Sequence, residues 1–350
     1  MEAPPPTGAN YRRLTGRVKR IARARLVRIS LVRISLVRTS LERMDGATLM
    51  EHWFRPMGLS LWVSTNSSKL AAAVCQAYDA FGAGDPRASA DLRFYFTQSS
   101  NGSIGIPEYR MSMHRSELRM CGKVILSIEP ERGLARGSFP EEFVNYQSSF
   151  RLHALHFALS AALAGRGFLG VHAACIVMDG RAVLLRGPHG AGKSFLAYAA
   201  ASRGFRVVTD STVWIAPDDM AWWGIPQWIY LRSSARAFFA QIPAGPEVLI
   251  GDERKIEVGV PQGPAGGVAP GIVVLLKRNL GGACRLEAIS KAEALAMWDS
   301  GGAGNEAGQS DYRARIARIL DGPVYRLNSA DESDRALDLI AAATEDSARC

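Results

Sequence analysis

The sequence predicts an α/β protein with a mixed sheet, preceded by a smaller α+β domain. First, an apolar run at 182–185, a glycine-rich bend, a helical stretch at 194–203 and a second apolar run ending at Asp210 form a strand–loop–helix–strand unit. Second, Asp179-Gly180 separates two apolar runs, and this dipeptide favours a tight antiparallel hairpin. Third, short strand-like runs surround one helical stretch between 53 and 136.

Length and composition fit this division. The chain has 350 residues, of which 47% are hydrophobic, and this is enough apolar material for one large domain or two ordinary ones. We expect a basic, repeat-containing and disordered segment at 1–45, a small α+β domain at 46–137 and the main α/β domain at 138–350. No apolar run reaches the roughly 18 residues of a membrane span, so we expect no transmembrane segment.

The positive charge is confined to the N-terminal segment. Residues 1–43 hold eleven Lys and Arg against two acidic residues, which accounts for the whole net charge of +9. The remaining chain is therefore neutral overall, unlike a surface that binds many phosphates of a nucleic acid. We expect no nucleic-acid partner.

The same segment contains a five-residue repeat, LVRIS LVRIS LVRTS, from 26 to 40. A period of five keeps apolar residues on neither one helix face nor one strand face, so the segment is expected to be disordered or weakly helical. Its composition is similar to that of an organelle transit peptide, and a role at a membrane surface or with an acidic partner also fits. Alternatively, it is an upstream repeat translated from a misplaced start, with Met44 or Met50 as the true beginning.

The five cysteines are scattered, and none has the spacing of a zinc site or a disulfide framework. Free thiols in a reducing compartment are the expected state, so we expect a cytoplasmic protein.

The expected small domain carries no chemical motif. Its predicted elements are a helix and four strand-like stretches, with Gly82 ending the helix; they lie at 68–81, 59–64, 92–97, 109–120 and 123–128. The domain would serve substrate recognition, oligomer contact or cover for the larger domain. A second helix is expected to start near Ser138, with Ser138 as its cap, Pro140 in its first turn and Glu141 completing a capping box, and to end at 165–167.

Residues 187–194, GPHGAGKS, match the phosphate-binding pattern G-x-x-x-x-G-K-[ST] without a mismatch. Gly190 and Gly192 allow backbone angles that turn successive N–H groups into one concavity, and the following helix adds the positive end of its dipole. Lys193 can reach the β and γ phosphates, and Ser194 can give its hydroxyl oxygen to Mg²⁺. The expected nucleotide contacts in this stretch are Gly187, Pro188, His189, Gly190, Ala191, Gly192, Lys193, Ser194 and Phe195.

Asp210 ends the next predicted strand, seventeen residues after Lys193. An acid at this position is where a second Mg²⁺ ligand or a base is expected, although a simple turn aspartate also fits. His189, inside the loop, is interpreted as tolerated there and not as catalytic. Four tryptophans beyond Asp210 either belong to the core or form a wall that grips an acceptor; they are Trp214, Trp222, Trp223 and Trp228.

These motifs, in this order, resemble the catalytic domain of bacterial HPr serine kinases and their relatives. The resemblance depends on His172 before the hairpin, on the GPHGAGKS loop, and on RGFRVVTD one helix later, within residues 168 to about 290. It implies a P-loop kinase domain with a mixed sheet like that of phosphoenolpyruvate carboxykinases, and ATP and Mg²⁺ as cofactors. It also implies that His172 contacts the phosphate or the base, although a structural histidine fits this position equally. Some relatives phosphorylate a serine of lasso-type precursor peptides.

The sequence departs from that family in two places. Ser211 stands where the family has a second aspartate, so Asp210 would perform both metal binding and base duty, or another acid would help. The glycine-rich signature that follows the catalytic core is absent, and Arg232 is the nearest basic residue able to contact phosphate. Both departures argue against a reverse phosphorylase activity and against HPr as the substrate.

The leading hypothesis is transfer of the γ-phosphoryl group of ATP to a serine hydroxyl of a small protein or precursor peptide. Lys193, Asp210 and His172 are the expected catalytic residues, Ser194 and Asp210 the metal ligands, and Arg232 a further nucleotide contact. A small-molecule kinase on the same fold and a nucleotide-binding module without turnover remain as alternatives. A homo-oligomer is possible.

Overall fold

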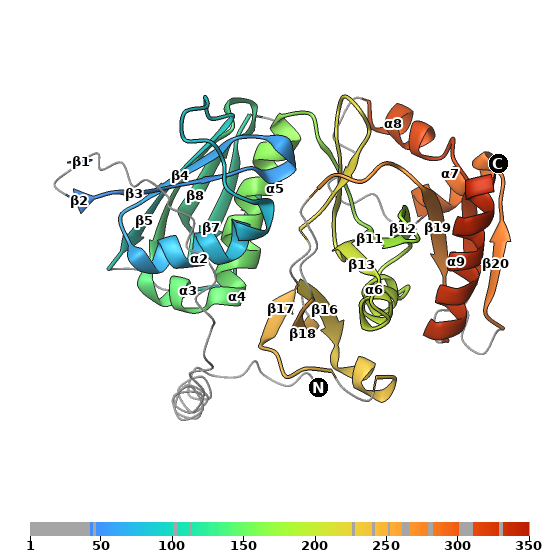
Figure 1. Cartoon of the computed structure of the whole chain (residues 1–350). Helices are drawn as coiled ribbons and strands as arrows, with labels where there is room; N and C mark the ends of the chain where they lie inside the picture. The colour runs from blue at the N-terminus through green and yellow to red at the C-terminus, as the bar shows by residue number, and fades with distance from the viewer. Residues whose placement is uncertain are drawn as a thin grey trace, which may run out of the picture. The chain divides into compact units, whose positions relative to one another are not determined.

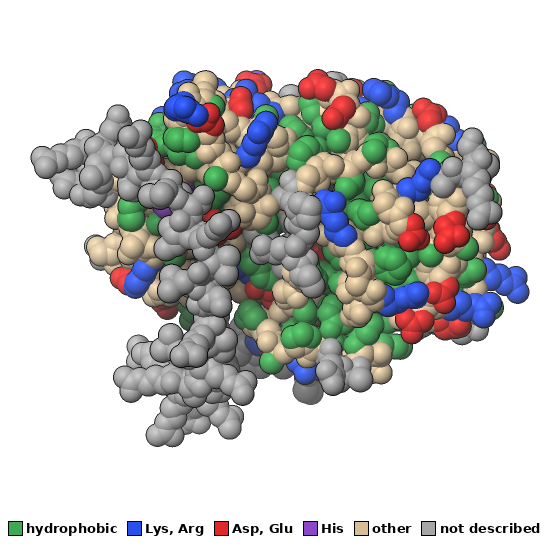
Figure 2. Space-filling model, in the orientation of Figure 1, with side chains coloured by type: hydrophobic (Ala, Val, Ile, Leu, Met, Phe, Trp, Pro, Cys, Tyr) green, Lys and Arg blue, Asp and Glu red, His purple; other side chains and the backbone are tan. Residues whose placement is uncertain are grey.

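The computed structural model describes residues 43–44, 47–100, 104–112, 114–225, 228–239, 242–250, 253–260, 266–278, 283–300, 311–328 and 332–349. The basic repeat at 26–40 lies outside these residues, so the expectations for it stay predictions. In the part of the chain that is described, no helix combines the length and apolar character needed to cross a bilayer. On the face shown in Figure 2, acidic and basic side chains are interspersed.

Within the described residues, a seven-stranded mixed sheet follows the short β1–β2 hairpin, Arg43–Met44 and Ala47–Thr48. Strands β4, β5 and β9 are parallel, and the other pairs are antiparallel. The order in the sheet is β3 Met50–Phe54, β4 Leu61–Thr65, β5 Leu92–Ser99, β9 Leu134–Pro140, β8 Lys123–Glu129, β7 Ser116–Met120 and β6 Glu108–Arg110. The short 3₁₀ turns nearby are η1 Pro56–Gly58, η2 Asp79–Phe81 and η3 Pro130–Arg132.

Helices α2, Ser68–Tyr78, and α5, His156–Gly165, pack on this sheet (Figure 1). Between the sheet and α5 the chain forms α3 Glu141–Asn145, α4 Gln147–Phe150 and a π-helical turn, η4 Arg151–Leu155. The core is rich in aromatic rings, because alternate residues of β5, Leu92, Phe94 and Phe96, are all buried. The expected helix at 68–81 and strands at 59–64, 92–97 and 123–128 are thus confirmed, while 109–120 splits into β6 and β7.

The expected helix start at Ser138 is wrong. Ser138 lies in strand β9 opposite Thr97, and the helix begins at Glu141 without a side-chain cap. Long-range pairing with β5 overrides the local capping pattern, because seven consecutive residues of β9 find partners there. Phe94 lies before the expected boundary at 137/138, and Phe139 and Phe168 lie after it, yet all three belong to the same hydrophobic core. The expected division of the chain at that point stays a prediction.

The second large sheet holds the glycine-rich loop. In the described residues its order is β13 Arg206–Thr209, β11 Ala174–Met178, β12 Arg181–Arg186, β19 Ile272–Lys277, β21 Val324–Asn328 and β20 Arg285–Ala288. Strands β12, β19 and β21 run parallel, and β11 is antiparallel to both of its neighbours. This is the mixed sheet that the sequence predicts.

Both faces of this sheet are covered, because alternate side chains of β12 belong to two different hydrophobic cores. Val183 and Leu185 belong to the core with α6, Lys193–Ser202, and α9, Ser333–Arg349. Ala182 and Leu184 belong to the core on the other face, with residues of α7, Lys291–Ser300, and α8, Tyr312–Ile319. Because successive side chains of a strand point to opposite faces, a strand covered on both sides is apolar throughout.

The predicted hairpin is confirmed. Strands β11 and β12 pair from Ala174↔Leu185 to Met178↔Arg181, with Asp179 and Gly180 at the turn. Their φ angles are 49° and 77°, the positive values that a tight two-residue hairpin requires. The loop strand β12 therefore has an antiparallel partner on one side and a parallel partner on the other.

Two further three-stranded sheets lie within the described residues. One contains β10 Leu169–Val171, β14 Val213–Ile215 and β15 Trp222–Trp223. The other contains β16 Trp228–Arg232, β18 Glu253–Gly259 and β17 Glu247–Ile250, with a 3₁₀ turn, η5 Ser233–Ala237, directly after β16. This last sheet supplies one wall of the candidate site.

Candidate functional site

The glycine-rich loop connects β12 to α6. Strand β12 ends at Arg186 and α6 begins at Lys193, so the predicted strand–loop–helix conformation is confirmed. Gly190 has φ of 78° and Gly192 has φ of 101° as the residue that caps α6, and L side chains rarely adopt such angles. A Cβ atom on Gly187 would lie 2.8 Å from the carbonyl oxygen of Leu276 on β19, so the loop also needs glycine where it passes the neighbouring strand. Phosphate binding by this loop stays a prediction.

Lys193 lies against the backbone of the loop. Its side chain is buried, and its Nζ donates to the carbonyl oxygens of Gly187 at 2.8 Å and Pro188 at 3.2 Å. A buried ammonium group needs such partners, because burying an uncompensated charge is costly. The residue is thus held at the first turn of α6, beside the glycine-rich bend.

Asp210 follows β13 directly and is 3% exposed. Its Oδ2 accepts the backbone N–H of Tyr230 at 3.0 Å, and its carboxylate accepts the hydroxyl of Ser194 from the start of α6. Burial raises the pKa of Asp210 to about 6, although these hydrogen bonds and the charges of Lys255 and Lys193 act to lower it. The structure therefore brings together the two residues that the sequence predicts as metal ligands.

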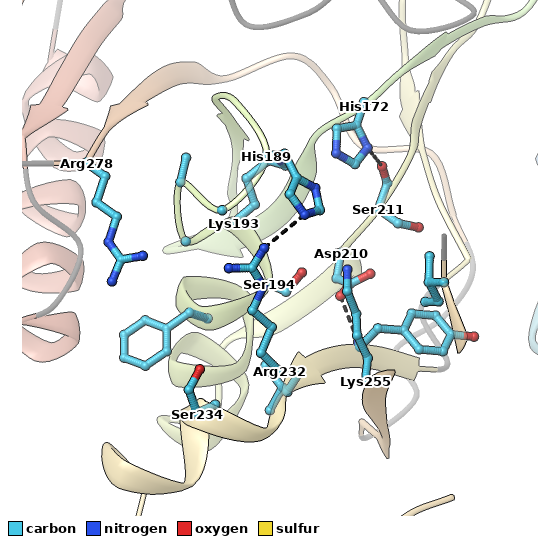
Figure 3. A pocket seen from close by; sticks show the side chains of 18 of the residues that line it. His172, His189, Lys193, Ser194, Asp210, Ser211, Arg232, Ser234, Lys255 and Arg278 are labelled. Carbon is cyan, nitrogen blue, oxygen red and sulfur yellow. Dashed lines mark hydrogen bonds between the residues drawn. The ribbon is translucent and has the colours of Figure 1, made fainter. Parts of the chain in front are cut away.

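His172 lies between β10 and β11 and lines one cavity together with Lys193 and Asp210. Its Nδ1 is 2.9 Å from the carbonyl oxygen of Ser211, which implies that this nitrogen carries the proton. Its own carbonyl accepts Nη1 of Arg186 at 3.3 Å. Ser211 thus orients a histidine through its backbone, and the ring is near the loop, as predicted (Figure 3).

Arg232, at the end of β16, reaches the glycine-rich loop. Its Nη2 is 2.9 Å from Nε2 of His189, and Nη1 lies 3.5 Å from where a Cβ of Gly190 would be. Glu253 accepts Nε of Arg232 at 3.2 Å and Nη2 at 2.5 Å. Arg232 thus lies beside the glycine-rich loop with His189 as a partner, and its contact with phosphate stays a prediction.

These groups line one cavity of about 250 Å³ (Figure 3). From the sequence-predicted set it contains His172, His189, Gly190, Ala191, Gly192, Lys193, Ser194, Phe195, Asp210 and Arg232. Gly187 and Pro188 contribute the carbonyl groups that hold Lys193. Phe195 packs on Phe239, with ring centroids 4.8 Å apart.

Sequence reasoning missed several residues of this cavity. Lys255 comes from β18, directly opposite Arg232, and Arg278 directly follows β19. The apolar run at 271–279 ends in basic residues, and this was the sequence signal for Arg278. Strand β19 runs parallel to β12, so the carboxyl ends of both strands lie at the same edge of the sheet. No local pattern marks Lys255.

The four tryptophans beyond Asp210 divide between core and partly buried positions. Trp214 and Trp222 are buried, which confirms the core interpretation for these two. Trp223 and Trp228 are partly exposed, and Trp228 stacks on the guanidinium of Arg151 at 3.6 Å from its ring centroid.

Among the described residues, no group of three or more His, Cys, Asp or Glu side chains could hold a metal ion by itself. Ser194 and Asp210 nevertheless fit a magnesium ion that takes its remaining ligands from phosphate and water, since Mg²⁺ is commonly held through one or two protein oxygens.

No protein-family model matches this chain, and no curated protein matches it. Among solved structures, the HPr(Ser) kinase/phosphatase from Coxiella burnetii is similar with a TM-score of 0.22 and 14% sequence identity. The similarity covers 50% of this chain and 95% of that chain.

Proposed function

We propose that this protein is an ATP-dependent kinase that transfers the γ-phosphoryl group to a serine hydroxyl of a small protein or precursor peptide. One observation carries the proposal. The Ser194 hydroxyl, at the first turn of the helix after a GxxxxGKS loop, is hydrogen-bonded to the buried carboxylate of Asp210. The residues proposed as the phosphate-binding loop, the metal ligands and the base thus line one cavity together with Lys193.

The loop and α6 supply the triphosphate site. Backbone N–H groups at the bend and at the start of α6 favour an anion, because they lack helical partners and lie at the positive end of the helix dipole. Lys193 exchanges its loop carbonyls for phosphate oxygens. Arg232, Lys255 and Arg278 add positive charge where negative charge spreads over the transferred group.

Ser194 and Asp210 would hold the magnesium ion together with phosphate oxygens and water. The ion, when bound, neutralises charge on the β and γ phosphates and draws electrons from the bond to the leaving group. Since Ser211 carries no carboxylate, Asp210 is the acid available at this position for both metal binding and proton transfer.

Asp210 also acts as the base. It accepts the proton of the acceptor hydroxyl as the hydroxyl oxygen bonds to the γ phosphorus and the bond to the departing ADP oxygen breaks. A pKa of about 6 suits this task, because the group is mostly ionised at pH 7 yet more basic than an ordinary aspartate. Positioning and electrostatics supply most of the catalysis in such a transfer.

The test is incubation of the purified protein with Mg·ATP, alone and with short peptides encoded beside its gene, followed by mass spectrometry. We expect release of ADP and a gain of one phosphate on a peptide serine. Phosphate gained only by a sugar, amino acid or nucleoside would replace the peptide with a small-molecule acceptor. ATP that binds and is never consumed would leave a nucleotide-binding module and contradict the kinase.

A further inference from the structure

A buried ion pair lies one strand away from Asp210 and has no part in the chemistry described so far. Nη2 of Arg151 is 2.5 Å from Oε2 of Glu257, and the two side chains are 3% and 6% exposed. Ser148 donates its hydroxyl to the other oxygen of Glu257 at 3.2 Å. Trp228 stacks on the guanidinium of Arg151.

The arginine comes from an unusual segment. Arg151 opens the π-helical turn η4 between α4 and α5, and π turns occur often at functional sites. The next residue, Leu152, lines the cavity that holds Lys193 and Asp210. Neighbouring Phe150 and Leu155 are anchored in the core of the seven-stranded sheet.

Stability alone does not account for such a pair. Taking two charges out of water costs about as much as their attraction returns, and apolar replacements of buried pairs are often neutral or stabilising. A buried pair kept at this position therefore calls for a role in fixing a particular geometry.

The geometry it fixes is that of strand β16. Glu257 of β18 lies directly opposite Tyr230 of β16, and the backbone N–H of Tyr230 is a donor to Asp210. Trp228, which stacks on Arg151, and Arg232, which reaches His189, are two residues to either side of Tyr230. Side chains two residues apart share one face of a strand. Strand β16 therefore connects the ion pair, the N–H donor to Asp210 and Arg232.

We propose that Arg151 and Glu257 are positioning residues that hold β16 in register with the site, so that the N–H of Tyr230 stays on the carboxylate of Asp210. This inference rests on the kinase proposed above. A hydrogen bond from a backbone N–H favours the ionised carboxylate. Loosening β16 therefore withdraws this donor from the carboxylate that serves as the base, and phosphoryl transfer slows.

The test compares Arg151→Met, Glu257→Gln and the double variant with the wild type, by kcat and KM for ADP release from Mg·ATP at constant pH and by Tm. We expect roughly a tenfold lower kcat in each single variant, with KM for ATP within about threefold of the wild type. In the double variant, which contains no lone buried charge, Tm should recover while kcat stays low. Arg119→Met, which breaks a pair with Glu117 on β7, is the matched control and should change neither.

An unchanged kcat in all three variants, with the wild type active, overturns the positioning role and leaves the kinase intact. Recovery of both Tm and kcat in the double variant also overturns it, because the loss then came only from the unpaired charge. A wild-type protein that neither binds nor consumes ATP overturns the proposed function and this inference together.

Discussion

Replacing Lys193 with methionine is expected to lower kcat for ADP release from Mg·ATP by about 10³-fold or more, equivalent to about 4 kcal/mol of transition-state stabilisation. The ammonium group is fixed on the carbonyls of Gly187 and Pro188, at the first turn of the helix that follows the loop. Methionine has a similar length and apolar stem, so the helix should keep its packing while the charge is lost. Turnover under saturating nucleotide measures the effect.

Lys123→Met is the matched control for this change, because Lys123 is exposed on β8, away from the cavity lining. It should retain wild-type turnover. Turnover by Lys193→Met within about threefold of wild type, with an unchanged Tm, would contradict the role of the loop lysine.

Replacing Asp210 with asparagine is expected to leave Mg·ATP binding within about tenfold of wild type and to lower transfer by about 10³-fold. The amide oxygen can still accept the N–H of Tyr230, so the strand contact survives, but the base and the charged metal ligand are lost. Calorimetry measures the first quantity and ADP release the second.

The pH profile adds a second readout for Asp210. The carboxylate is the active form and its pKa is raised to about 6 by burial, so wild-type kcat/KM should fall as the pH drops through about 6. The residual activity of Asp210→Asn should lack this limb. Asp218→Asn, at an exposed turn, is the control and should keep it. Full activity in Asp210→Asn, or an acid limb that persists in it, would refute the assignment.

Much of the sheet that holds the glycine-rich loop could be predicted because its signals are local. Positive φ angles at Asp179, Gly180, Gly190 and Gly192 follow from residue types that tolerate them. The glycine-rich loop is likewise recognisable from the spacing of its glycines, lysine and serine within eight residues. The position of Asp210 follows from one strand and one helix of predictable length.

The rest of the site could not be predicted because it depends on which strands become neighbours. Lys255 reaches the cavity through the pairing of β18 with β16, and Arg278 through the parallel pairing of β19 with β12. Arg151, which lies outside the cavity lining, comes from a π-helical turn that has no sequence signature. The predicted helix start at Ser138 was wrong for the same reason, since the pairing partner of Ser138 lies 41 residues earlier in β5.

The proposed chemistry requires that the bend at 187–194 bind the triphosphate of a nucleotide. The most direct measurement is a calorimetric titration of the purified chain with Mg·ATP at pH 7.5, repeated with EDTA in place of magnesium. We predict a saturable heat for one site, with a markedly weaker affinity when the metal is withheld. Absence of binding with millimolar adenine and guanine triphosphates in the presence of magnesium would contradict the claim.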